Sequence, residues 1–107
     1  MISVCIATYN GAKYVDQQLK SILNQLSKND EVIVVDDCSI DDTLGKIKII
    51  NDPRIKIHEN KSNLGVANTF GKAISMAEGD IIFTADQDDL WYDNKVQSIV
   101  NLFNIDK

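Results

Sequence analysis

Apolar residues along this chain fall into two kinds of stretch, short β-branched runs and longer segments with apolar residues three and four positions apart. The short runs predict strands, and the wider spacing predicts amphipathic helices. Predicted strands cover residues 2–7, 32–35, 55–58 and 81–84, and predicted helices cover residues 14–26, 44–50, 66–77 and 96–103. Strand 32–35 is apolar throughout, which is typical of a parallel strand covered on both faces, whereas strand 55–58 alternates and is expected to be half-exposed.

Strands and helices alternate through short connections, and this order predicts an α/β fold with three α/β/α layers and a mostly parallel open sheet. Residues 1–107 form one domain of four βα units in this interpretation. Ser39 and Asp42 resemble a capping box for the second helix, and Gly79 is typical of a residue that ends the third. Ligands of such sheets bind at the carboxyl ends of the strands, so the following loops are the expected site.

The composition narrows the class of partner. The 107 residues are 44% hydrophobic and 25% charged, with a formal net charge of -5. These values suit one globular domain, and the negative charge disfavours nucleic acid or an anionic membrane surface, which attract Lys and Arg clusters. Cys5 and Cys38 have no CxxC spacing and are expected to be buried free thiols. There is no apolar stretch of about 18 residues, so the cytoplasm is the expected location.

An acidic cluster at the end of the last predicted strand is the clearest chemical signal. Asp86, Asp88 and Asp89 repel one another unless a cation or protons neutralise them. Carboxylate oxygens suit Mg²⁺ or Mn²⁺, and Mg²⁺ usually completes its coordination with water and substrate phosphates. The alternative is that these residues form a turn and cap the next helix. Their place at the expected ligand edge favours the metal.

Two other loops carry candidate residues with two interpretations each. Asp36 and Asp37 follow the second strand, where they would bind a ligand N–H or hydroxyl, or cap the next helix. Tyr9 follows the first strand, where its ring would stack on a base or pack within the protein, and packing is favoured.

The start of the third helix offers a further group. Asn63, Gly65 and Asn68 would present N–H groups to a phosphate or sugar, or form the cap of that helix. His58 has no second metal-ligand candidate nearby, so we expect a structural role for it.

Four stretches together resemble a known family, the inverting family-2 glycosyltransferases with the GT-A fold. They read SVCIATYNG at 3–11, VVDDCSIDDT at 34–43, NLGVAN at 63–68 and EGDIIFTADQDDLW at 78–91. The resemblance covers nearly the whole chain in the right order, and 86–91 is similar to rhamnosyltransferase-like members. It implies that residues 1–107 are the N-terminal, nucleotide-sugar-binding part of a truncated GT-A domain. Cys38 stands where the family frequently has glycine.

The resemblance also implies roles for residues. Ala7, Thr8 and Tyr9 would line the base pocket, and the Asp36–Asp37 pair, chiefly Asp37, would recognise a pyrimidine. The segment 86–88 looks like the DxD motif of the family. In that motif Asp88 would contact Mn²⁺ or Mg²⁺ and Asp86 would face the ribose or the metal shell, while Asp89 stays an alternative inner-sphere ligand.

The reaction implied is a single displacement with inversion, from a UDP- or dTDP-sugar to a hydroxyl of a saccharide or lipid-linked acceptor. It belongs to bacterial polysaccharide or glycoconjugate synthesis, in the cytoplasm or at the inner membrane face for the full-length protein. The family places its general base after the DxD strand, so no catalytic base is named here and this chain alone is expected to bind donor with little transfer. An exposed sheet edge would favour a homodimer.

Two other classes are alternatives. A phosphorylatable receiver domain also has an acidic pair, but after its first strand, whereas the pair at 36–37 follows the second. A non-catalytic binding domain would use the acidic edge only for solubility and caps. Metal-dependent nucleotide binding is expected from the transferase alone.

Overall fold

The computed structural model describes residues 1–85, and the predicted helix 96–103 lies outside the described residues. The described part forms one parallel sheet with strand order β3-β2-β1-β4. The elements are β1 (Ile2–Thr8), α1 (Val15–Leu23), β2 (Glu31–Asp36), α2 (Thr43–Ile50), β3 (Ile55–Glu59), α3 (Val66–Met76) and β4 (Ile81–Ala85). The four predicted strands and the α/β class are therefore confirmed.

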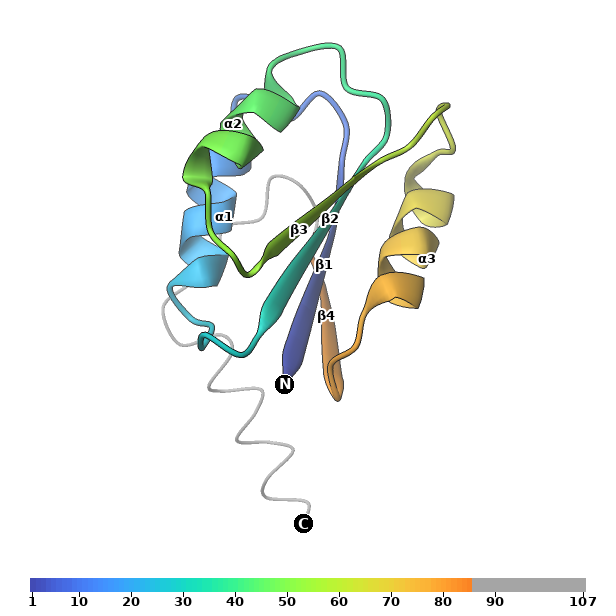
Figure 1. The fold of residues 1–107 in the computed structure, drawn as a ribbon. Helices are drawn as coiled ribbons and strands as arrows, with labels where there is room; N and C mark the ends of the chain where they lie inside the picture. The colour runs from blue at the N-terminus through green and yellow to red at the C-terminus, as the bar shows by residue number, and fades with distance from the viewer. Residues whose placement is uncertain (86–107) are drawn as a thin grey trace.

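Helices cover both faces of the sheet, with α1 and α2 on one side and α3 on the other (Figure 1). Side chains of a strand point alternately to the two faces, so β1 and β2 supply both cores. The larger core joins Val4, Ile6, Val32 and Val34 to Leu19, Ile22 and Ile47, and the smaller core joins Cys5, Ile33 and Val35 to Ala73. The three predicted layers are present.

The position of each strand in the sheet explains its burial. All six residues of β2 are buried, as predicted for a strand covered on both faces and paired on both sides. The β3 strand lies at an edge and is only partly buried, as its alternating pattern predicts. His58 on β3 is partly buried there.

Two helix starts differ from the prediction. The α1 helix begins at Val15, after Tyr14, which is 44% exposed and does not belong to the buried face. The capping box of Ser39 and Asp42 is wrong, because α2 begins at Thr43 and Asp42 makes no side-chain cap bond. Instead, the Ser39 hydroxyl donates to Asp36 Oδ1 at 2.6 Å, since a charged acceptor makes the stronger hydrogen bond.

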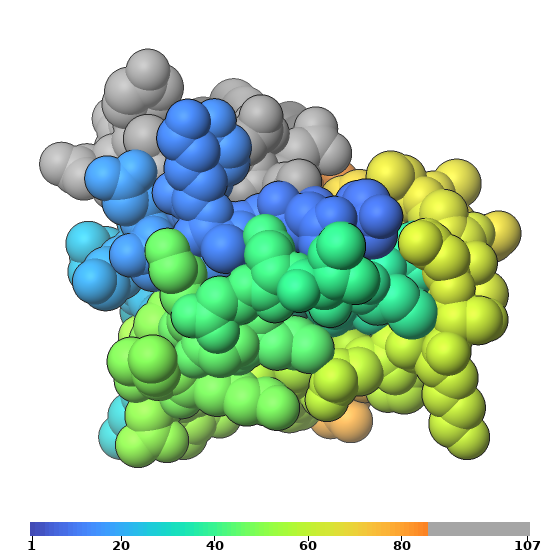
Figure 2. Space-filling view, turned by 90° about the horizontal axis from the view of Figure 1, so that it is seen from above, coloured from blue at the N-terminus to red at the C-terminus, as the bar shows by residue number. Residues whose placement is uncertain are grey.

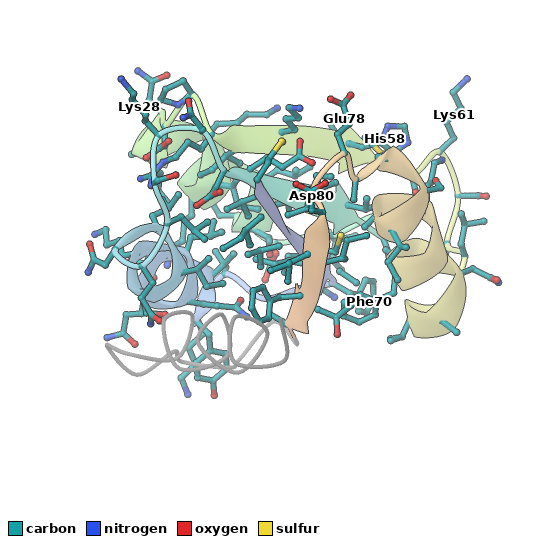
Figure 3. All side chains as sticks on the ribbon, turned by 90° about the horizontal axis from the view of Figure 1, so that it is seen from below. Lys28, His58, Lys61, Phe70, Glu78 and Asp80 are labelled. Carbon is teal, nitrogen blue, oxygen red and sulfur yellow. The ribbon has the colours of Figure 1, made fainter. Side chains whose placement is uncertain are left out.

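Gly79 does not end α3, which stops at Met76. A Cβ at Gly79 would lie 2.5 Å from Ser3 Oγ and 2.7 Å from Ser3 N, so only glycine lets this segment pass against β1. The Gly79 N–H donates to Ser3 Oγ at 2.8 Å. Figure 3, seen from below, labels the neighbouring residues Glu78 and Asp80 at this amino-terminal edge of the sheet.

Gly71 lies inside α3, exposed, with nothing within 4 Å of an added Cβ. We expect Gly71→Ala to raise the free energy of unfolding by about 0.5–1 kcal/mol, because alanine loses less backbone entropy in a helix. Urea unfolding measures this change. Gly45→Ala in α2 is the control, because its Cβ would collide with Asp42 Oδ1 and part of the gain would be lost. Equal gains at both glycines would contradict the prediction.

Candidate functional site

The loops at the carboxyl edge of the sheet form the candidate site. From β1 the chain passes through α1 to β2 and then through α2 to β3, and both strands lie on the same side of β1 in the sheet. It then crosses the other face of the sheet through α3 to β4, which lies on the opposite side of β1. Strand order therefore reverses between β1 and β4, the place where open parallel sheets bind ligands. Figure 2 looks onto this edge, where the loops after β1, β2 and β3 lie together.

Asp36, at the end of β2, is a buried carboxylate that holds two loops together. Its Oδ1 accepts the Thr8 hydroxyl at 2.7 Å and the Ser39 hydroxyl at 2.6 Å, and its Oδ2 accepts the Ser39 N–H at 2.8 Å. Thr8 is also its register partner across β1 and β2. The structure thus brings Thr8 and Asp36 together, as the sequence predicts for residues of one site.

Asp37 is 5% exposed and binds the loop that precedes α3. Its Oδ1 accepts the Leu64 N–H at 2.7 Å and Asn60 Nδ2 at 3.0 Å, and its Oδ2 accepts the Gly65 N–H at 3.0 Å. The Leu64 N–H holds the pKa of this carboxyl below its usual value, and together with hydrogen bonds from Asn60, Gly65 and Thr69 it outweighs the opposing effect of burial. Asp37 is therefore a structural anchor as well as a candidate ligand residue.

Asn60 is a residue of the candidate site that the sequence pattern did not indicate. Its Nδ2 donates to Asp37 and, at 3.2 Å, to the Thr69 hydroxyl. This leaves Asn60 Oδ1 as a buried acceptor that has no partner in the described part of the chain. A signal existed, because Asn60 directly follows β3 and so lies at the carboxyl edge of the sheet.

Cys38 and Tyr9 shape the surface of the site. Cys38 has a φ of 62°, the left-handed region that favours glycine, and its thiol donates to the Asn60 carbonyl at 3.2 Å. The turn expected for glycine is therefore kept. Both cysteines are free, but Cys38 is partly exposed rather than buried. Tyr9 is 45% exposed and belongs to neither core, so its ring lies at the surface of this edge.

The loop before α3 contains the remaining candidates. Gly65 is the N-cap residue of α3, with a φ of 85° and no side-chain cap bond. Asn68 Nδ2 donates to the Leu64 carbonyl at 3.0 Å, and Asn63 is exposed. The cap interpretation therefore holds for the Gly65 backbone and not for the side chain of Asn63.

The predicted metal ligands Asp86 and Asp88, and the alternative Asp89, lie outside the described residues. Within residues 1–85, no group of three or more His, Cys, Asp or Glu side chains is placed to hold a metal ion. The described chain ends at Ala85, whose register partner on β1 is Ile6.

In the described part of the chain, none of the helices has the length and apolar character that crossing a membrane requires.

Comparisons with known proteins point to one family. The profile of Glycosyl transferase family 2 matches residues 3–107. An uncharacterized glycosyltransferase of Haemophilus influenzae is 36% identical over 102 residues, which cover 94% of this chain and 32% of the relative. The UDP-Glc:alpha-D-GlcNAc-diphosphoundecaprenol beta-1,3-glucosyltransferase WfaP of Escherichia coli is 34% identical over 107 residues, which cover 100% of this chain and 43% of the relative.

Solved structures are also similar to this chain. S. aureus TarS 1–349 in complex with UDP-GlcNAc matches with a TM-score of 0.89 and 31% identity, over 97% of this chain and 31% of that protein. The mannosyltransferase PcManGT from Pyrobaculum calidifontis, in complex with GDP-Man and Mn²⁺, matches with a TM-score of 0.84 and 27% identity, over 92% of this chain and 31% of that protein. The chain thus spans less than half the length of each of these relatives.

Proposed function

The chain belongs to glycosyl transferase family 2, and from that premise we propose that it forms the donor-binding part of a sugar-transferring enzyme. The observation that carries the proposal is the meeting of Thr8, Asp36, Asp37 and the Gly65 loop beside the switch point of the sheet. The proposed donor is a UDP- or dTDP-sugar. The UDP-GlcNAc bound to TarS and the UDP-Glc in the name of WfaP support UDP.

Base recognition is proposed for the ends of β1 and β2. Ala7, Thr8 and Tyr9 would line the pocket, and Asp36 would hold its wall through Thr8. Asp37 lies beside this pocket, at the end of β2, and its Oδ2 accepts the Gly65 N–H at 3.0 Å. In this proposal the Asp37 carboxylate would accept the N–H of a pyrimidine.

The diphosphate and sugar are assigned to the other side of the site. Asn63, Gly65 and Asn68, at the start of α3, would face the sugar or a phosphate. Asp86 and Asp88 would hold Mn²⁺ or Mg²⁺, since their donor chemistry fits hard cations and Mn²⁺ accompanies GDP-Man in the mannosyltransferase. When bound, the metal would neutralise charge on the leaving nucleoside diphosphate.

For the full-length protein we propose hexosyl transfer to an acceptor hydroxyl with inversion, in polysaccharide synthesis. The name of WfaP supports a lipid-linked acceptor at the inner membrane face. Donor binding is assigned to this chain, and little transfer is expected from it alone. Homodimers through an exposed sheet edge stay part of the proposal.

Calorimetry with UDP and dTDP, with and without Mn²⁺, tests the function. We expect Mn²⁺ to tighten nucleotide binding at least about tenfold, a difference of about 1.4 kcal/mol. Asp88→Asn should abolish this metal effect, because the amide lacks the charge that a hard cation prefers.

Asp80→Asn is the matched control, since its side chain is 91% exposed at the opposite edge of the sheet. Nucleotide binding that is equally tight without metal would contradict the proposed role of Asp86 and Asp88 as metal ligands. Stable phosphorylation by a small phosphodonor, without nucleotide binding, would support the receiver alternative instead.

A further inference from the structure

Three consecutive backbone N–H groups in the loop after β1 donate to side chains of the loop after β2 and of the first residue of α2. The Asn10 N–H donates to Ser39 Oγ at 2.8 Å, the Gly11 N–H to Thr43 Oγ1 at 2.8 Å, and the Ala12 N–H to Asp41 Oδ2 at 3.2 Å. The two loops are thus connected residue by residue across about 30 positions of sequence.

Other contacts reinforce this connection. Asn10, whose φ is 50°, accepts the Ile40 N–H on its Oδ1 at 2.9 Å, and Lys46 Nζ donates to the Ala12 carbonyl at 2.7 Å. Thr43 is fully buried, and its hydroxyl donates to Asp41 Oδ1. That hydrogen bond holds the pKa of Asp41 below its usual value, so Asp41 carries its charge at neutral pH.

Consecutive N–H groups after the first strand of an α/β sheet are the usual phosphate-binding device of nucleotide-binding folds. Here oxygen atoms of the protein already occupy these donors, and one of these oxygens belongs to a negatively charged carboxylate. A donor diphosphate would meet repulsion and no available N–H at residues 10–12. These three N–H groups are therefore unavailable to a phosphate, and the base is the part of the ligand that Tyr9 would contact in the proposed site.

We propose that Thr43 and Asp41 are positioning residues that hold the Tyr9–Asn10 turn in its base-binding shape, while the diphosphate lies away from this loop. The inference rests on the proposed donor binding and deepens it. Thr43 has no contact with substrate in this proposal and acts through the Gly11 backbone.

The test compares Thr43→Val, which removes the hydroxyl and keeps the shape, with Thr43→Ser, which keeps the hydroxyl. Dissociation constants for UDP and for uridine are measured below the melting temperature of every variant. We expect Thr43→Val to weaken both ligands by the same factor, about tenfold, because the loop contacts the shared base. Thr43→Ser should stay within about twofold of wild type.

Three outcomes would overturn the inference. These are unchanged affinity in folded Thr43→Val, a loss confined to UDP, and a Thr43→Ser variant as weak as Thr43→Val. If wild type binds neither UDP nor uridine, both the inference and the proposed function fail. The three outcomes above contradict the inference alone and leave donor binding intact. Should Thr43→Val not fold, Asp41→Ala carries the same test, because it removes the acceptor of the Ala12 N–H and of the Thr43 hydroxyl.

Discussion

Asp37→Ala is expected to lower the free energy of unfolding by about 3 kcal/mol and to abolish nucleotide binding. The carboxylate accepts hydrogen bonds from Asn60, Leu64 and Gly65, and the last two donors are backbone N–H groups that no other side chain is seen to bind in the described part of the chain. Alanine would leave them without an acceptor and would release the loop before α3. Urea unfolding and calorimetry with UDP measure the two effects.

Asp42→Ala is the matched control, an exposed aspartate of the neighbouring loop that makes no side-chain cap bond. We expect a change within about 0.5 kcal/mol for Asp42→Ala and unchanged nucleotide affinity. A comparable loss of stability in both variants would show that charge near α2, rather than the anchor at Asp37, is responsible.

The effect of Asp37 depends on pH in a defined direction. Its pKa is lowered in the folded protein, so its contribution is present above the unfolded pKa of about 3.9 and is lost as pH falls through the folded value. The deficit of Asp37→Asn should therefore be largest near neutral pH and should shrink in acid below about pH 4. A deficit that stays constant from neutral to acid pH would exclude the carboxylate charge as its source.

Glu31→Ala is expected to cost about 3 kcal/mol, at the opposite edge of the sheet and without a direct effect on the site. Glu31 is 2% exposed, and its Oε2 accepts the Ser3 hydroxyl at 2.6 Å and the Glu78 N–H at 2.8 Å. Lys56 Nζ donates to its Oε1 at 2.7 Å. One carboxylate thus joins β1, β2, β3 and the segment that enters β4. Its removal would leave the Ser3 hydroxyl and the Glu78 N–H without their acceptor.

Burial alone would raise the pKa of Glu31, but the hydrogen bonds from Glu78, Lys56 and Ser3 outweigh burial and hold it below its usual value. Lys56→Met is the control, because the Lys56 side chain is 51% exposed and exposed ion-pair partners contribute little. Urea unfolding should show a large loss for Glu31→Ala and a small one for Lys56→Met. Equal losses would mean that the ion pair, and not the buried hydrogen bonds, supplies the stability.

The local sequence pattern was sufficient to predict the strands and the position of Asp36 and Asp37 in the fold. The uninterrupted apolar run 32–35 marks a strand with two covered faces because no polar side chain would be tolerated there, and β2 is buried throughout. Since parallel strands end at one edge, Asp36 and Asp37 had to lie beside Thr8.

Helix starts and polar partners were less predictable. Serine is a residue type typical of helix caps, yet the Ser39 hydroxyl donates to the Asp36 carboxylate and accepts the Asn10 N–H. Asn60 lies in a stretch that is merely polar along the chain, and it becomes part of the site through Asp37 and Thr69.

By itself, the sequence determined the strands, the layers and the edge where the candidate site lies, because hydrophobic periodicity and strand ends are local properties, and its four motif stretches indicated the family. Only the tertiary structure decided which polar groups meet. Thr43 with Gly11, Asp37 with Gly65 and Glu31 with Glu78 are pairs separated by 32, 28 and 47 positions. Their hydrogen bonds depend on how the folded chain brings distant positions together, and a local sequence pattern does not indicate which distant residues meet.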